Sequence, residues 1–289
     1  MTFLIIRHLT TYHYKQPVAF GEHRIMLRPR DDDDQTVLES RLEITPEPSE
    51  LTWTQDIFGN HVAIARFADR ASELSFKSTI HVDHARTDFH TTDIDDFART
   101  YPFDYADRDK VFIARYTAPL SPHRGLALWT AQFRFEDGSA DTCGLLVSMT
   151  QAIKQNFKHV ARHEKGIQDP VNTLKLMSGS CRDLAGLMIA ALRSLGFAAR
   201  FVSGYLHLPD DDDDRITGGN THAWVQVYVP GPGWIDVAPS SGMVGNQNLV
   251  RVAVVHEPRE AIPLQGTWFG SASDHLAMNV AVKVVAISA

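Results

Sequence analysis

The sequence predicts an α+β protein in which a first part made of strands precedes helices that lead into further strands. Short runs of alternating apolar and polar residues, with Pro, Gly or Asp between most of them, fill residues 1 to about 115. Beyond residue 120, apolar residues instead recur at intervals of three and four, which is the helical spacing. A chain of 289 residues can bury a core and allows one or two domains.

Residues 1–115 are predicted to form a β-sandwich-like domain that serves a structural or substrate-positioning purpose. The strand candidates are TYHYKQPV, HRIMLRPR, SRLEITPE, HVAIARFA and SFKSTIHVDHA. Gly59 and Asn60 in DIFGNHV mark a turn, because both residues accept a positive φ at low cost. This part contains no cysteine and little helical periodicity.

Residues 116–250 are predicted to hold helices followed by a sheet. SPHRGLALWTAQF is a short helix candidate, residues 145–160 form one amphipathic face, and residues 173–177 allow one helical turn. A longer helix starts at Cys181, and Gly196 suits the position just after its end. The strand candidates that follow are AARFVSGY, HAWVQVYV and GWIDVAP; in residues 251–289, the nearly continuous apolar run from Ala277 to Ile287 predicts a buried strand.

Composition excludes several function classes. The net charge of −7 comes from two aspartate runs, Asp31–Asp34 and Asp210–Asp214, which we expect to be solvated loop tips. No basic stripe indicates nucleic acid, and no apolar run approaches the roughly 20 residues that span a bilayer. The first residues lack the basic segment and cleavage site of a signal peptide, so a cytoplasmic location is expected. An uninterrupted aspartate run lacks the spaced ligands of a calcium loop, and no cofactor is expected.

Cys181 and His222 are the candidate catalytic residues. The helix start at Cys181 offers unpaired backbone N–H groups and a partial positive charge, both of which favour a thiolate. His222 opens a strand whose alternation places it on one face with Trp224, while the opposite face is apolar. An imidazole near that thiol would serve as its base. Cys143, by contrast, is expected to be a small buried hydrophobe.

Asp236 is the candidate third catalytic residue, because a carboxylate would fix the tautomer of the imidazole. It is the one acid in the strand GWIDVAP, where it shares a face with Trp234 and Ala238. An acid in a strand is also often merely exposed.

These motifs resemble those of the bacterial transglutaminase-like proteins, a group regarded as cysteine proteases. TTYHYKQPV, HRIMLRPRD, LEITPEP and DIFGNHV resemble the N-terminal region of that family. GSCRDLAGLMIAALRSLGFAARFVSGY and THAWVQVYVPGPGW resemble its core in order and spacing. The resemblance implies a papain-like core in which a helix bearing the nucleophile Cys181 packs on an antiparallel sheet bearing the base His222. It also implies that residues 251–289 return to the N-terminal domain.

The chain departs from the family pattern at the third position. That pattern places an aspartate four residues after the tryptophan and directly before a proline, where this chain has Ala238. Three accounts stay open: Asp236 substitutes through a shifted register, a Cys-His dyad suffices, or the site is inactive. Arg182 replaces a frequent glutamine and brings a positive charge beside the thiol, which favours its ionisation.

The expected function is cysteine-dependent acyl transfer on amide or isopeptide bonds of a peptide or protein substrate. The alternative is a catalytically inactive module that holds a peptide in the same cleft, as Ala238 suggests. A zinc site at His81, Asp83, His84 and His90 is a weaker hypothesis, because residues three apart on a strand point to opposite faces. An acidic loop at residues 210–214 beside the cleft would favour basic substrates. The sequence leaves the oligomeric state open.

Overall fold

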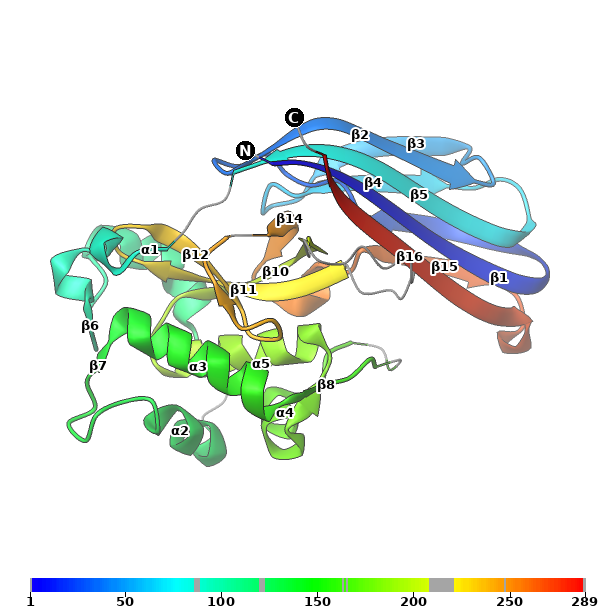
Figure 1. Cartoon of the computed structure of the whole chain (residues 1–289). Coiled ribbons are helices and arrows are strands. Elements are labelled where there is room, and N and C mark those ends of the chain that lie inside the picture. The colour runs from blue at the N-terminus through cyan, green and yellow to red at the C-terminus, as the bar shows by residue number, and fades with distance from the viewer. Residues whose placement is uncertain are drawn as a thin grey trace.

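The computed structural model describes residues 2–85, 89–119, 123–162, 164, 166–207, 221–246 and 248–287. A large sheet made mostly from the N-terminal part lies over a core of helices and a second sheet (Figure 1). The predicted α+β class is confirmed. No helix in these ranges is long and apolar enough to cross a membrane.

The N-terminal sheet is organised around one long strand. β1 (Thr2–Ile25) pairs through its first half with β5 (Ala71–His84) and β16 (His275–Ile287), and through its second half with β4 (His61–Arg66) and β15 (Leu264–Phe269). The outer strands β2 (Gln35–Thr45) and β3 (Glu50–Gln55) pair with β5 and β4. A strand of 24 residues would extend about 80 Å, and the register shift after His13 marks where β1 changes partners. In Figure 1, β16 (red) runs beside β1 (dark blue), so both chain ends belong to this sheet.

The predicted C-terminal strand is present, but the prediction that it is buried is wrong. Residues 277–287 do lie in β16, but within the described ranges the strand pairs with β1 alone, and most of its side chains are partly or fully exposed. Val282 is buried because it faces the core, where Tyr205, Val250 and Val252 cover it. A run of apolar residues does not reveal whether a second layer covers a strand.

The core contains five helices among the described residues. They are α1 (Asp107–Thr117), α2 (Arg124–Ala131), α3 (Thr142–Asn156), α4 (Pro170–Leu176) and α5 (Cys181–Ser194). The last four confirm the predicted helices, and Gly196 follows α5 with a φ of 87°. The expectation of strands alone up to residue 115 is wrong at α1. Its adjacent Val111, Phe112 and Ile113 show no helical spacing, and Ile113 is the one that is buried.

Short elements connect these helices. The 3-10 turns η1 (Thr91–Asp93) and η2 (Asp96–Ala98) lead to β6 (Thr100–Tyr101), which pairs with β7 (Ala140–Asp141). β8 (Lys158–His159) pairs in parallel with β9 (Ser178–Gly179), directly before Cys181.

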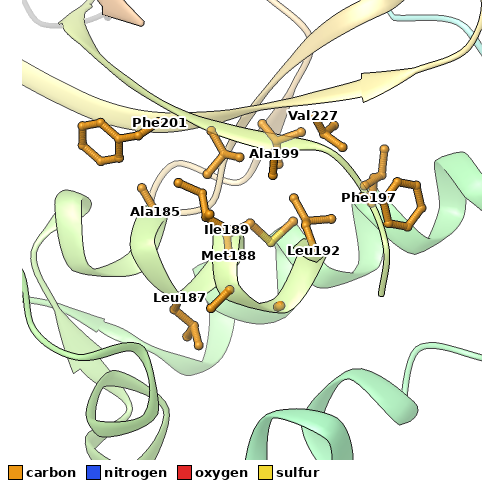
Figure 2. Packing of buried hydrophobic residues seen from close by; sticks show 14 of the residues in the cluster. Ala185, Leu187, Met188, Ile189, Leu192, Phe197, Ala199, Phe201 and Val227 are labelled. Atoms are coloured by element: carbon orange, nitrogen blue, oxygen red, sulfur yellow. The ribbon is translucent and has the colours of Figure 1, made fainter. Parts of the chain in front are cut away.

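The core sheet has the order β13-β12-β11-β10-β14. Its strands are β10 (Ala199–Leu206), β11 (Thr221–Val229), β12 (Gly233–Ala238), β13 (Met243–Val244) and β14 (Leu249–Val255). All its pairings are antiparallel. Figure 2 shows the buried face of α5 against β10 and β11, with Ile189 and Leu192 close to Ala199 and Val227. This packing holds α5 against the sheet.

Two side-chain amides of the N-terminal part complete the edge of the core sheet. Asn60 donates to the carbonyl of Val254 (3.0 Å) and accepts from its N–H (2.9 Å). Gln35 pairs in the same way with the carbonyl and N–H of Arg251, both at 2.8 Å. β14 is an edge strand, so each amide supplies the bonds that a neighbouring strand would otherwise make.

The first aspartate run also lies at this junction. Asp31 and Asp33 are exposed, but the predicted solvated tip is wrong for Asp34, which forms an ion pair with the buried Arg251. Asp32 lies 3.4 Å from the same guanidinium. A partner more than 200 positions away leaves no local signal in the sequence. The second run, Asp210–Asp214, and the substrate preference predicted for it lie outside the described residues.

Candidate active site

The first turn of α5 is fixed by a buried carboxylate. Ser180 is the N-cap, and its N–H donates to Asp183 (2.8 Å), which completes a capping box with the Ser180 side chain. Asp183 is fully buried and also accepts from Arg162 (2.7 Å) and the N–H of Gln168 (2.6 Å). Burial alone would raise the pKa of Asp183, but these hydrogen bonds and the charge of Arg162 outweigh it and hold the pKa below its usual value.

Gly179 makes the close approach to this carboxylate possible. A Cβ atom at this position would lie 2.8 Å from the Cβ of Asp183, which is closer than two carbons can pack. Cys181 therefore follows a segment that is held by β8 on one side and by Asp183 on the other.

Cys181 is the first residue of α5 and is half-buried. Burial raises the pKa of its thiol, against the opposing effects of the Ala223 and Arg182 backbone N–H groups and of the Arg182 charge. The Ala223 N–H belongs to β11 and directly follows His222 in the chain. The structure therefore brings the thiol to the start of the strand that carries the predicted base.

Arg182 is turned away from the thiol. Its guanidinium donates to the carbonyls of Pro258 (2.6 Å) and Ala261 (3.3 Å), at the turn η3 (Pro258–Glu260), and lies over the ring of Phe201. Its positive charge still lowers the pKa of Cys181, as the sequence predicted, but burial has the larger effect. Arg182 thus anchors the segment after β14, and it affects the pKa of the Cys181 thiol through its charge rather than through its guanidinium's hydrogen bonds.

His222 is buried beside Trp224 and Ser240. Its ring stacks on Trp224 with centroids 6.0 Å apart, and its Nε2 atom lies 3.4 Å from the hydroxyl of Ser240. Burial lowers the pKa of His222 to about 4, with smaller contributions from the charges of His159 and Lys154. The imidazole is therefore neutral at pH 7. Burial therefore opposes both the thiolate that the sequence favoured at Cys181 and an imidazolium at His222.

Asp236 lies in the same layer but is bonded elsewhere. One carboxylate oxygen accepts from the indole N–H of Trp224 (2.6 Å), and the other accepts from Arg251 (2.6 Å). Burial raises the pKa of Asp236, while the direct contact with Arg251 favours the ionised carboxylate. No hydrogen bond joins it to His222, although both residues are described, so the direct imidazole contact expected of Asp236 is not formed. Trp224 stands between them.

The family's aspartate position holds a buried apolar residue. Ala238 is inaccessible to solvent and packs in a cluster with Val202, Trp224 and Leu249. Two residues further on, the hydroxyl of Ser240 occupies the vicinity of His222. Both Ser240 and Ser241 lie close to Ala238 in the sequence, which does not indicate which of the two contacts His222. That choice depends on the turn between β12 and β13.

Three residues of the zinc hypothesis, His81, Asp83 and His84, lie on β5, and His90 lies beyond the end of that strand. His81 is partly exposed and faces Glu39 at 3.4 Å, whereas His84 is buried with its Nε2 atom 3.1 Å from the carbonyl of Leu249. Across the described part of the chain, no three His, Cys, Asp or Glu side chains are grouped as metal ligands.

A cavity of about 570 Å³ lies away from this site. Its lining includes Phe103, Ile113 and Phe197, between α1 and the C-terminal end of α5. Cys181 is at the other end of α5, about 20 Å along the helix axis. The cavity is therefore separate from the candidate active site.

Comparisons with known proteins agree with this architecture. Residues 133–239 match the model of the transglutaminase-like superfamily, and residues 4–83 match that of the bacterial transglutaminase-like N-terminal region.

Relatives of similar length include uncharacterized mycobacterial proteins. Rv2569c of Mycobacterium tuberculosis is 26% identical over 294 residues, which cover 97% of this chain and 91% of that protein. ML0607 of Mycobacterium leprae is 23% identical, with 97% and 98% covered. A crystal structure described as a "putative cysteine protease" from Cytophaga hutchinsonii matches with a TM-score of 0.74 over 100% of this chain and 91% of that chain. At 19% identity, this likeness shows a shared fold.

Proposed function

We propose that the protein is a cysteine-dependent acyl-transfer enzyme that cleaves amide or isopeptide bonds in a peptide or protein substrate. The observation that carries the proposal is the junction of α5 and β11, where the thiol of Cys181 lies against the backbone N–H that follows His222. A rigid helix start and a strand end hold the nucleophile and the base, as this chemistry requires.

His222 acts in this proposal as a neutral general base. It accepts the thiol proton while the sulfur of Cys181 bonds to the substrate carbonyl carbon, which gives a tetrahedral oxyanion. The backbone N–H of Cys181 at the start of α5 stabilises that oxyanion. The C–N bond then breaks, His222 returns the proton to the leaving amine, and a thioester remains. Water attacks the thioester, releases the acid and restores the thiol; an amine in place of water gives transamidation.

A non-catalytic peptide-binding module is the second candidate function, and Ala238 is the observation that favours it. An apolar residue stands where the family pattern has a carboxylate, in the same layer as Trp224. In that case the wild type would lack His222-dependent reactivity, and Ala238→Asp would create it.

The pH dependence of alkylation tests the two functions. Iodoacetamide labelling of Cys181 and Cys143 is followed separately by peptide mass spectrometry, in the wild type and in His222→Ala. We expect Cys181 to react at about pH 7 in the wild type and at least about tenfold more slowly in His222→Ala, because the base is lost. Cys143 is half-buried on α3 and serves as the internal control. Equal rates of Cys181 in both proteins at every pH would contradict the proposed enzyme.

Substrate turnover gives a second readout. Cys181→Ala is expected to abolish cleavage of an amide substrate, and Cys143→Ala to leave it intact. The same loss in both variants, or in neither, would show that Cys181 is not the nucleophile.

A further inference from the structure

A continuous chain of contacts leads from His222 to the N-terminal domain. Trp224 is fully buried, stacks on His222 with an interplanar angle of 26° and donates its indole N–H to Asp236. The rotation of an indole ring is restricted when its N–H is bonded to a buried carboxylate. The face of the Trp224 ring is therefore a fixed surface on which the imidazole of His222 stacks.

Arg251 continues the chain on the other side of Asp236. Its side chain is 5% exposed, and it donates to Asp236 through Nη1 and to Asp34 through Nη2, while its Nε atom lies 3.4 Å from a carboxylate oxygen of Asp32. Asp32 and Asp34 precede β2 in the N-terminal domain, whereas Arg251 and Asp236 lie on β14 and β12. Asp34 also accepts from the side-chain amide of Asn246, which fixes its position.

Stability alone is a poor explanation for this network. It gathers three carboxylates around one guanidinium in a mostly buried position. Desolvation of buried ion pairs offsets much of their attraction, so apolar packing would stabilise the junction as well. The gain specific to charged groups is fixed geometry, since a guanidinium that binds several carboxylates has one preferred orientation.

We propose that Asp236 and Arg251 are positioning residues, which fix Trp224 and through it the imidazole of His222, and that Asp32 and Asp34 make the N-terminal domain part of this support. The inference rests on the proposed function of Cys181 and His222. It gives Asp236 a role different from direct contact with the imidazole.

The test compares three variants with the wild type. Trp224→Phe keeps an aromatic ring and removes the N–H, Asp236→Asn removes the charge at constant shape, and Asp34→Asn weakens the far end of the network, where a loss of folding is least expected. The readout is the alkylation rate of Cys181 by iodoacetamide at about pH 7 divided by the rate at about pH 10. At the higher pH hydroxide can take the thiol proton in place of the base, so the ratio isolates the contribution of His222.

We expect the ratio to fall about tenfold in Asp236→Asn and Trp224→Phe, and about threefold in Asp34→Asn. Falls of this size are what the loss of one hydrogen bond typically costs. A purely structural role predicts a different result. Loosened packing would expose Cys181 and raise its alkylation rate at both pH values.

Asn60→Ala is the matched control. Asn60 is fully buried, joins the N-terminal domain to the same strand as Arg251, and contacts Val254 and Asp56 outside the network. We expect a lower melting temperature and the wild-type ratio. If Cys181 of the wild type reacts in a His222-dependent way but all three network variants keep the wild-type ratio, this inference is overturned while the proposed function stands. A wild type without His222-dependent reactivity would overturn the proposed function and this inference with it.

Discussion

The imidazole of His222 has a hydroxyl rather than a carboxylate beside its Nε2 atom. Ser240 lies 3.4 Å from that atom, while the nearby carboxylate of Asp236 is bonded to Trp224 and Arg251. A hydroxyl orients an imidazole but offers no charge to an imidazolium. This agrees with the low pKa that burial gives His222. In the proposed function, His222 would thus be a base that is neutral before the reaction.

Ser240→Ala tests the hydroxyl directly. At 3.4 Å its hydrogen bond is long, so we expect a loss of about 0.5–1.5 kcal/mol, or about two- to tenfold in the alkylation rate of Cys181 at pH 7. Ser241→Ala is the matched control, because the hydroxyl of Ser241 donates to the carbonyl of Ala238 instead. Equal effects of the two substitutions would show that the turn, and not the hydroxyl of Ser240, affects His222.

The first turn of α5 is the element that determines where the thiol lies. Asp183 joins this turn to Arg162 and to the N–H groups of Gln168 and Ser180, so one carboxylate organises two loops and the helix start. The chain before Cys181 is also paired with β8. The position of Cys181 therefore depends on a buried polar centre rather than on the intrinsic propensity of the helix.

Asp183→Asn is expected to destabilise the protein by about 3–5 kcal/mol, because it leaves the Arg162 charge without its buried partner. The melting temperature measures this loss. Because the pKa of Asp183 is lowered on folding, its contribution is present above the unfolded pKa and is lost as the pH falls through the folded pKa. The difference between wild type and Asp183→Asn should therefore shrink in acid, and a constant difference down to about pH 2 would contradict the assignment.

Local patterns predicted the elements that carry the proposed catalytic residues. The spacing of Leu184, Leu187 and Leu192 indicated α5, and alternation around His222 indicated β11, because both signals depend on neighbours within one element. The fold class and the resemblance to the transglutaminase-like superfamily also followed from the sequence. Contacts between distant segments did not. Three contacts depend on the assembled sheet: the hydrogen bond from Trp224 to Asp236, the ion pair of Asp34 with Arg251, and the contact of Ser240 rather than Ser241 with His222.

Polar and apolar contacts cross the junction between the two parts of the molecule. Leu4, Ile6 and Val82 of the N-terminal sheet pack with Tyr205 and Val250 of the core. Asn60 and Gln35 pair with the free edge of β14. Side-chain amides recognise the backbone of an edge strand without adding another strand, and they cover groups that would otherwise be buried unpaired.

Asn60→Ala would leave the N–H and carbonyl of Val254 without these partners. We expect a loss of about 1–3 kcal/mol for each group that water does not reach, seen as a lower urea midpoint. Asn60→Asp is the informative companion, because it retains an acceptor for the N–H and loses the donor to the carbonyl. A midpoint for Asn60→Asp no lower than that of the wild type would contradict this view of the junction.

The stability of the whole molecule is expected to depend on pH through His8. This histidine of β1 is 3% exposed and bonds to Tyr205 of β10 (2.9 Å) and to Thr10 (3.0 Å), so it lies between the two parts of the protein. Burial lowers the pKa of His8 to about 4. Between that value and the unfolded pKa near 6.5, the unfolded chain binds the extra proton. Stability therefore falls as the pH drops through this window.

A titration of unfolding free energy can isolate this histidine. From these pKa values, His8 alone should cost the wild type about 2 kcal/mol between pH 7.5 and pH 5. His8→Gln should lose that much less over the same interval, because glutamine fills the junction without titrating. Tyr205→Phe removes the hydroxyl partner but keeps the buried imidazole, so it should lower the curve and retain its slope. If the curves of wild type and His8→Gln run parallel, the charge of His8 has no part in acid unfolding, and the other buried histidine with a pKa of about 4, His222, becomes the group to replace next.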